Sequence, residues 1–404
     1  MDKEYKKQRV VCLFLSFLLC FTPIVSSLNV IFNVFLGGIS LNTGLLYIIY
    51  FVLMVAFLFS NIRYMPKKLL CALAFFFVSY FSTVMFFPQN VEYMWTTVDD
   101  ILTNPTYIFL FFVISGFIAG FYFNEMELFI SIFEKFSVVT VALLATRFFM
   151  GFIIRSSMPE YMTFSYNLLL PTTFVLLLCI KEFRVYRAVV AILGVGLIFV
   201  AGCRGALLGV VISPLIYIFF FGKLEKNIKC RTTILLIAFL LVVLFFYDPI
   251  LQAVSSKLTS IGLNSRTLEM LLNSTITDDS SRGQILQNAM SQIGFLGYGL
   301  WGDRVILNGI YPHNIIVEIL IDYGWILGSG LLILMTTILI RGFIKAGTSK
   351  SVVMCALFSS GIVRLLLSGS YLGQEPAFYV LISLCLSEHG DTYNKTIAKT
   401  MIKT

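Results

Sequence analysis

The chain has 404 residues, of which 58% are hydrophobic and only 12% are charged, and its formal net charge is +8. A soluble globular protein carries about twice that charged fraction, so this composition excludes a soluble enzyme. The basic excess follows the short segments between apolar runs, and no nucleic-acid partner is needed to explain it.

Apolar runs of about 20 residues recur along the whole chain, and that is the length a helix needs to cross a hydrocarbon core of about 30 Å. Such runs must be helical in lipid, because a helix satisfies its own backbone hydrogen bonds. The sequence therefore predicts an all-α, polytopic membrane helix bundle of about 12 transmembrane helices, forming one integral membrane domain over residues 1–404. The spans are expected near residues 10–28, 43–61, 69–87, 106–123, 128–150, 165–180, 188–202, 206–221, 232–247, 314–340, 351–368 and 376–388.

The distribution of charge predicts the orientation of these spans. Most of the 29 basic residues fall in alternate short segments, beginning with Lys6, Lys7 and Arg9 and including Lys181 and Arg184. Such segments face the cytoplasm, so we expect both termini there. The outer basic residues are arginines, with the exception of Lys257.

Arginine suits bidentate capture of a phosphate or carboxylate, whereas lysine is a hydrated point charge. The outer arginines are therefore candidates for binding an anionic substrate. The alternative is that they pair with outer acids such as Asp303 or Glu375.

One large outer loop, residues 249–312, precedes the last three spans. Residues 280–294 within it have the periodicity of a short amphipathic helix, and a second helical piece is expected over residues 265–273. The first helix is expected to lie on the membrane surface or on the helix tops, while the glycine-rich stretch 294–302 is expected to form turns. Its apolar stripe comprises Ile285, Leu286, Ala289, Met290 and Ile293.

His313 is the candidate for acid–base chemistry. It follows Pro312 at the outer mouth of a membrane helix and precedes Asn314, and imidazole exchanges protons near neutral pH. Glu318 and Asp322 lie one and two turns into the same helix on a shared face. We expect them to face the protein interior, where they could pair with outer arginines. The alternative is that His313 is hydrogen-bonded to the loop at the interface without a catalytic role.

Two arginines have positions that predict an anion site. Arg282 lies in the first turn of the expected outer-loop helix, where a cation is unfavourable unless an anion is bound. Arg204 lies between two apolar spans with almost no loop, and a charge there needs a partner. A phosphate is the expected ligand, and a pair between Arg282 and Asp278 or Asp279 is the alternative. No metal-ligand spacing is present in the sequence.

Three segments resemble the O-antigen polymerase and O-antigen ligase superfamily. The stretch 311–328 resembles its hallmark segment, in which a His-Asn pair opens a helix, an acid follows about one turn in, and a glycine comes later; His313, Asn314, Glu318 and Gly324 occupy those positions. Leu327 departs from the ligase pattern, which has a small residue or tyrosine there. The other two segments are residues 201–208, an arginine-glycine segment, and residues 281–299, a loop arginine with a downstream Leu-Gly-x-Gly.

The resemblance implies a metal-independent glycosyltransferase without a cofactor, acting on the outer face of the bacterial inner membrane. The implied substrate is an undecaprenyl-diphosphate-linked oligosaccharide, and the implied partners are a chain-length regulator and a flippase in the same membrane. His313 is implied as the catalytic base and Arg282 and Arg204 as ligands of the diphosphate, with Asn314, Glu318 and Arg266 in support.

Within the superfamily, the run from Asn314 to Gly324 is more similar to polymerases of O-antigen or capsular polysaccharide. A ligase that transfers glycan to lipid A-core shares the donor and these residues, so it stays an alternative. A flippase for the same lipid-linked units is a further alternative. It is less favoured because transporters usually place the substrate near the midplane of two repeated halves.

Overall fold

The computed structural model describes residues 3–35, 50–55, 57, 66–95, 105–153, 161–221, 279–373 and 375–387, with helical fragments at 234, 238, 249, 252–253 and 256–257. All regular structure within these residues is helical, which confirms the predicted all-α class. Its helices are α1 (Lys3–Phe35), α3 (Lys67–Phe86), η2 (Pro88–Asn90), α4 (Val91–Trp95), α5 (Pro105–Ile108), η4 (Phe109–Ile114), α6 (Ser115–Tyr122), α7 (Met126–Ile153), α8 (Tyr161–Lys181), α9 (Val185–Ala201), α10 (Arg204–Ile216), η5 (Tyr217–Phe221), α13 (Asp279–Ser291), α14 (Gly302–Ile306), α15 (Ile315–Ile344), α16 (Thr348–Phe358), η7 (Ser359–Val363), α17 (Arg364–Leu367) and α18 (Pro376–Leu386).

Eight helical segments in the described part are long and apolar enough to cross a membrane, and α9 and α18 are shorter apolar helices. Three of the long segments are composite, because α5, η4 and α6 run on as one helix, and so do α10 and η5, and α16, η7 and α17. These segments agree with a helical membrane protein. The expected spans 43–61 and 232–247 fall largely outside the described residues.

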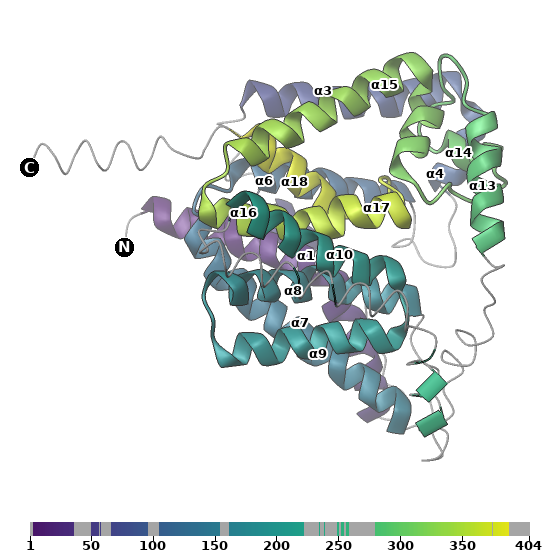
Figure 1. Ribbon diagram of the computed structural model, residues 1–404. Coiled ribbons are helices and arrows are strands. Elements are labelled where there is room, and N and C mark those ends of the chain that lie inside the picture. The colour runs from purple at the N-terminus through teal and green to yellow at the C-terminus, as the bar shows by residue number, and fades with distance from the viewer. Residues whose placement is uncertain are drawn as a thin grey trace, which may run out of the picture.

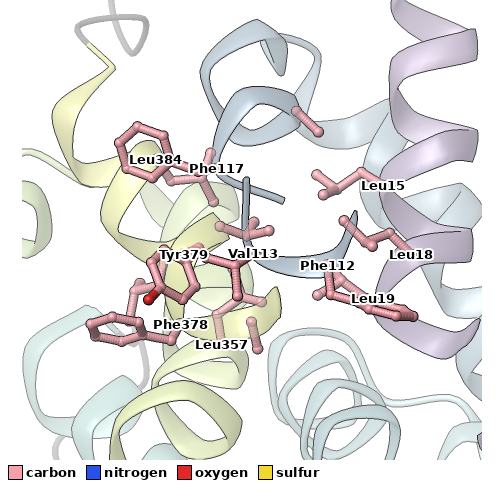
Figure 2. Close-up of a cluster of buried hydrophobic side chains, with 14 of the residues drawn as sticks. Leu15, Leu18, Leu19, Phe112, Val113, Phe117, Leu357, Phe378, Tyr379 and Leu384 are labelled. Atoms are coloured by element: carbon pink, nitrogen blue, oxygen red, sulfur yellow. The ribbon is translucent and has the colours of Figure 1, made fainter. Parts of the chain in front are cut away.

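The centre of the bundle is an apolar core that joins the N-terminal and C-terminal helices (Figure 2). Leu15 and Leu18 of α1 approach Phe112 of η4, while Phe117 of α6 lies beside α18. Such helices associate in lipid through van der Waals packing of their side chains. The first and last helices are therefore held around one core, which fixes the position of the helix ends between them.

Helices α6 and α18 approach closely because small residues face each other. A Cβ on Gly120 would overlap the Ser383 hydroxyl, and a Cβ on Gly116 would touch Pro376. Close backbone approach at small residues is a usual way of packing helices in membranes. This contact places the start of α18, and the loop before it, against the middle of the bundle.

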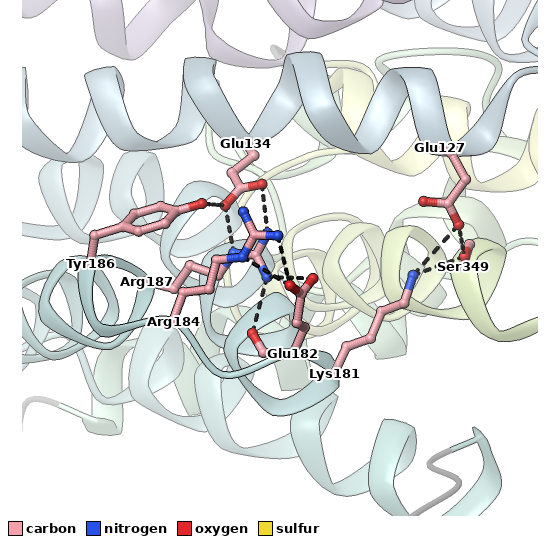
Figure 3. A network of polar contacts seen from close by, with 8 residues as sticks. All are labelled: Glu127, Glu134, Lys181, Glu182, Arg184, Tyr186, Arg187 and Ser349. Carbon is pink, nitrogen blue, oxygen red and sulfur yellow. Dashed lines mark hydrogen bonds and ion pairs between the residues drawn. The ribbon is translucent and has the colours of Figure 1, made fainter.

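Polar contacts tie several helices together at one end of the bundle, which we call the basic end (Figure 3). Lys181 at the end of α8 donates to the Ser349 hydroxyl of α16 at 2.9 Å and lies 3.6 Å from Glu127 of α7. Arg187 of α9 binds Glu134 of α7 through two nitrogens at 2.6 and 3.0 Å. Helices α7, α8, α9 and α16 therefore each have one end fixed here.

The other end, which we call the site end, gathers residues 88–95, 202–204, 279–313 and 368–375. In Figure 1, α13, α14 and α4 lie together there, away from the start of α1. The α14 segment docks on η2, where Asn90 donates to the carbonyls of Tyr298 and Leu300 at 2.8 and 2.9 Å. Helices α7, α8, α9 and α10 run alternately between the two ends, and so do α15, the continuous segment α16–α17, and α18.

The described part of the large loop contains two helices. The helix expected over residues 280–294 is α13, and its apolar stripe packs on α15 through Ala289, with Leu286 and Ile293 partly buried beside it. Met290 of the stripe is instead exposed. The glycine-rich stretch 294–302 forms turns, as expected, and the short helix α14 begins at its last residue, Gly302. The helix expected over residues 265–273 lies outside the described residues.

Candidate functional site

The entry into α15 is the centre of the candidate site. Asn314 caps this helix, since its side-chain oxygen accepts from the backbone N–H groups of Ile316 and Val317 at 3.0 and 3.3 Å. Its amide nitrogen donates to the Leu366 carbonyl of α17 at 3.3 Å. An N-cap of this kind stabilises a helix by about 1 kcal/mol. Asn314 therefore fixes where α15 starts and holds it against α17.

His313 has an unusual backbone conformation just before that cap. Its φ is 55°, in the left-handed region that a side chain with a Cβ rarely adopts. Such strain costs about 1–3 kcal/mol and persists where the surroundings enforce it, often at functional sites. The buried Pro312 before it and the Asn314 cap after it supply that enforcement. The imidazole is consequently directed by the fold and does not rotate freely with a surface loop.

The His313 imidazole is half-buried between an aromatic ring and positive charge. Its ring centroid lies 4.1 Å from that of Tyr311, at an interplanar angle of 51°. Burial and the charges of Arg282 and Arg304 hold the pKa of His313 below its ordinary value. The Nδ1 atom is enclosed and has no hydrogen-bond partner within the described residues. Both influences on the pKa favour the neutral imidazole, which has an unsatisfied nitrogen.

Arg304 of α14 is fully committed to neighbouring carboxylates. Its Nη1 donates to both oxygens of Asp303 at 2.6 Å and to Glu318 of α15 at 2.8 Å, and its Nη2 donates to the Ser370 hydroxyl at 2.6 Å. The guanidinium lies 5.4 Å from the Tyr311 ring centroid, a cation–π contact. Asp303 and Glu318 are completely buried. Two acids already hold this cation, which also contacts the Tyr311 ring that lies against His313.

Glu318 and Asp322 also anchor the loop between α17 and α18. The Ser370 hydroxyl donates to Glu318, and the Tyr371 backbone N–H donates to the other Glu318 oxygen at 3.1 Å. The Tyr371 hydroxyl donates to Asp322 at 2.6 Å. Both acids face the protein interior, as expected from the sequence, and Glu318 pairs with Arg304, one of the arginines expected on the outer side. The two acids hold the loop that surrounds the site, and no described hydrogen bond joins either of them to His313.

Arg364 of α17 forms a second cation–π and ion-pair unit nearby. Its guanidinium lies 4.9 Å from the Tyr166 ring centroid of α8 and pairs with Glu375. Gly205, in the first turn of α10, makes room for this tyrosine, since a Cβ there would overlap the Tyr166 hydroxyl. The arginine-glycine segment is thus held against α8 and α17 at the site end.

Arg282 differs from these two arginines, because no described carboxylate binds it. It is exposed on the first turn of α13, and its Nη2 lies 3.2 Å from the Met162 sulfur of α8. Its charge is one of those that lower the pKa of His313. A cation on a first helical turn adds to the partial positive charge of that helix end. The region between Arg282 and His313 is therefore electropositive and suited to an anion.

A break in α15 allows the glycine-rich loop to pack against this helix next to the site. Gly324 has φ 76° and ψ 174° inside the helix, and Gly297 has φ 79°; a Cβ on either residue would overlap the backbone of the other. Across the break, Tyr298 and Gly299 donate backbone hydrogen bonds to Ile321 and Asp322 at 3.0 and 2.9 Å. Irregular backbone at membrane depth must be satisfied by protein in this way. The break thereby positions the segment that leads into α14 and Arg304.

The structure brings some of the predicted residues together and leaves others apart. His313 and Arg282 are electrostatically coupled, and Asn314 and Glu318 act on the framework around them. Arg204 begins α10 at the same end with an exposed side chain, whereas Arg266 lies outside the described residues.

Sequence reasoning did not single out three residues of the site, Tyr311, Arg304 and Arg364. The preference for arginine over lysine in the outer segments was the available signal. That preference could not show which arginines are bound by acids. Arg304 and Arg364 are bound by Asp303 and Glu375, which confirms for these two arginines the alternative that they pair with acids. Within the described residues, no three His, Cys, Asp or Glu side chains are grouped to hold a metal ion.

Comparison of the chain with models of known protein families, with characterised protein sequences and with solved structures finds no match.

Proposed function

We propose that this protein is a polymerase of O-antigen or capsular polysaccharide, joining polyprenyl-diphosphate-linked repeat units on the outer face of the bacterial inner membrane. One observation carries the proposal: a neutral, half-buried imidazole with an unsatisfied Nδ1 lies in the field of Arg282, an exposed arginine without a described acid partner. A base beside an anion site, at one end of an apolar bundle, fits a reaction between membrane-bound diphosphate substrates. The resemblance of residues 311–328 to the superfamily supports the same conclusion.

In the proposed reaction, His313 accepts the proton of an acceptor sugar hydroxyl as that oxygen attacks the anomeric carbon of the donor glycan. A new glycosidic C–O bond forms while the bond from the anomeric carbon to the lipid diphosphate breaks. The acceptor hydroxyl would bind a nitrogen of the half-buried imidazole, since catalytic hydrogen bonds are often completed only by substrate. A histidine pKa below its ordinary value keeps the base free at neutral pH.

The leaving diphosphate needs positive charge that is not already neutralised. Arg304 is unsuited because Asp303 and Glu318 bind it. Arg282 is suited because its described contact is a thioether, and preorganised cations of this kind stabilise a departing anion. Arg204 at the start of α10 is proposed as the second diphosphate ligand. Because the leaving group is already activated, the mechanism uses no nucleotide, metal or other cofactor.

The proposal also sets the orientation of the chain. The basic end, with Lys181, Arg184 and Arg187, would face the cytoplasm together with both termini, following the positive-inside rule. The site end would face the opposite side, where lipid-linked repeat units arrive after a flippase has moved them. A chain-length regulator in the same membrane is the proposed second partner.

The test is reaction of the purified, reconstituted protein with undecaprenyl-diphosphate-linked repeat units, with the products separated on a gel. The wild-type protein should give a ladder that persists in EDTA, and His313→Ala should give single repeats only. His389→Ala is the matched control, because His389 is the other histidine of the chain and is not assigned a role.

Two outcomes would replace the proposal. Transfer to lipid A-core without a ladder would identify a ligase, and movement of lipid-linked units across the bilayer without bond formation would identify a flippase. A normal ladder from His313→Ala would remove the catalytic base.

A further inference from the structure

Helix α7 contains an arginine whose charge is not neutralised by the described protein. Arg147 lies 20 residues after Glu127, which at 1.5 Å per residue is about 30 Å along the axis, or about the thickness of the hydrocarbon core. Glu127 is at the basic end. Phe148, next to Arg147, stacks on Phe164 of α8 at 5.5 Å, close to the Met162 that contacts Arg282. Arg147 is therefore at the membrane boundary of the site end.

The contacts of Arg147 leave one edge of its guanidinium open. Its Nη1 donates to the Ser26 hydroxyl of α1 at 3.1 Å, and its Nε is enclosed without a hydrogen-bond partner. No carboxylate in the described part of the chain forms an ion pair with it, in contrast to Arg187, Arg304 and Arg364. Within the described residues, the Nη1–Nη2 end, which can bind phosphate through two parallel N–H groups, has the Ser26 hydroxyl as its one acceptor.

A charge in this position needs an anion. Arginine within an apolar helix is costly unless it reaches the interface or a counter-charge, and a buried, unpaired charge is strongly destabilising. Ser26 supplies a neutral oxygen only, and this hydroxyl already donates to the Pro23 carbonyl. The described protein tethers the guanidinium but does not neutralise it.

Arg147 also lies where a lipid can reach it. On either side of it along α7, Thr146 and Phe149 are exposed, whereas Phe148 is buried. The side chain is therefore at the rim between the lipid-facing and packed faces of the helix. In Figure 1 the last turns of α1 and α7, which pack together, extend beyond α9 at the lower right.

We propose that Arg147, tethered by Ser26, binds the phosphate of an anionic lipid head group in the outer rim of the α1–α7 pair. This site is built on α1 and α7 and uses neither His313 nor Arg282, and it depends only on the bundle spanning a membrane. The ligand chemistry is a phosphate on an apolar anchor. Its source is either a membrane phospholipid or a polyprenyl diphosphate, and the two are separated by experiment.

The experiment uses native mass spectrometry of the purified full-length protein with three probes: dioleoylphosphatidylglycerol, undecaprenyl diphosphate and dioleoylglycerol, which has no phosphate. The wild-type protein should bind a phosphate-bearing lipid one to one in preference to dioleoylglycerol. Arg147→Gln should raise the apparent Kd of that lipid at least about tenfold, as expected for loss of a charge-assisted hydrogen bond. Lys135→Gln removes a charge from the same helix toward the basic end and should leave the Kd unchanged.

The three probes and a second variant keep the result interpretable. If Arg147→Gln loses binding of phosphatidylglycerol alone, the site is assigned to a membrane phospholipid. If it loses binding of undecaprenyl diphosphate, the site is assigned to the lipid carrier. Arg147→Lys, which keeps the charge but not the two parallel N–H groups, should lose part of the affinity and serves if Arg147→Gln cannot be purified. Unchanged binding of both phosphate-bearing lipids in these variants, or equal binding of dioleoylglycerol to the wild type, overturns the proposal.

Discussion

Removal of the Arg304 guanidinium should destabilise the whole site end. In Arg304→Met, the completely buried carboxylates of Asp303 and Glu318 lose the cation that both contact within 2.8 Å. Breaking a buried ion pair by removing one partner costs about 3–5 kcal/mol, because an uncompensated charge stays in the interior. The loss should be at the upper part of that range, since two acids are left facing each other. It should also release Tyr311, which lies beneath the guanidinium.

Buried thiols provide the assay. Cys12, Cys20 and Cys355 are enclosed in the folded protein, so a thiol-reactive fluorescent dye reports their exposure as the detergent-solubilised protein is heated. A loss of 3 kcal/mol should lower the midpoint by at least about 6 °C, at the roughly 2 °C per kcal/mol of larger domains. Arg184→Met is the control, because its pair with Glu182 is exposed and should leave the midpoint unchanged.

A second substitution tests the reason for the loss. Glu318→Gln combined with Arg304→Met removes one of the two facing acids, so the double variant should be more stable than Arg304→Met alone. Such a coupling appears as non-additivity in a double-mutant cycle. A midpoint for Arg304→Met equal to that of the wild type, or a double variant that loses the sum of both effects, would refute the reasoning.

Three further predictions concern the entry into α15. Polymer formation should be constant at neutral and alkaline pH and should fall on acidification as His313 is protonated. Because the Arg282 charge lowers the His313 pKa, Arg282→Gln should move this fall in activity to higher pH. An unchanged pH profile would contradict the coupling. Gly324→Ala should destabilise the protein by clearly more than about 1–2 kcal/mol, which is the strain of one left-handed residue. The reason is that its Cβ would overlap the backbone at Gly297. An unfolding midpoint within error of the wild type would be evidence against the break. Asn314→Ala should cost about 1 kcal/mol in thermal unfolding, with Asn314→Asp retaining the cap, and equal losses in both variants would argue against capping.

Local sequence was sufficient for the helical membrane character and for the boundaries of most elements. An apolar run of the required length is stable in lipid only as a helix, so the start of α15 after Asn314 could be predicted. Helix α13 could be predicted from its amphipathic periodicity. The inward direction of Glu318 and Asp322 followed from helical periodicity and from the cost of exposing an acid to lipid.

Tertiary structure determined which charges are already neutralised. Arg304, Arg364 and Arg282 look alike in the sequence, yet the first two are bound by acids, whereas no carboxylate in the described part of the chain binds the third. The break at Gly324, and the loop docked across it, depend on Gly297 approaching from a distant segment. Long side chains and irregular backbone take their partners from whatever the packing brings near, so spacing along the chain could predict which residues are candidates but not how they are paired.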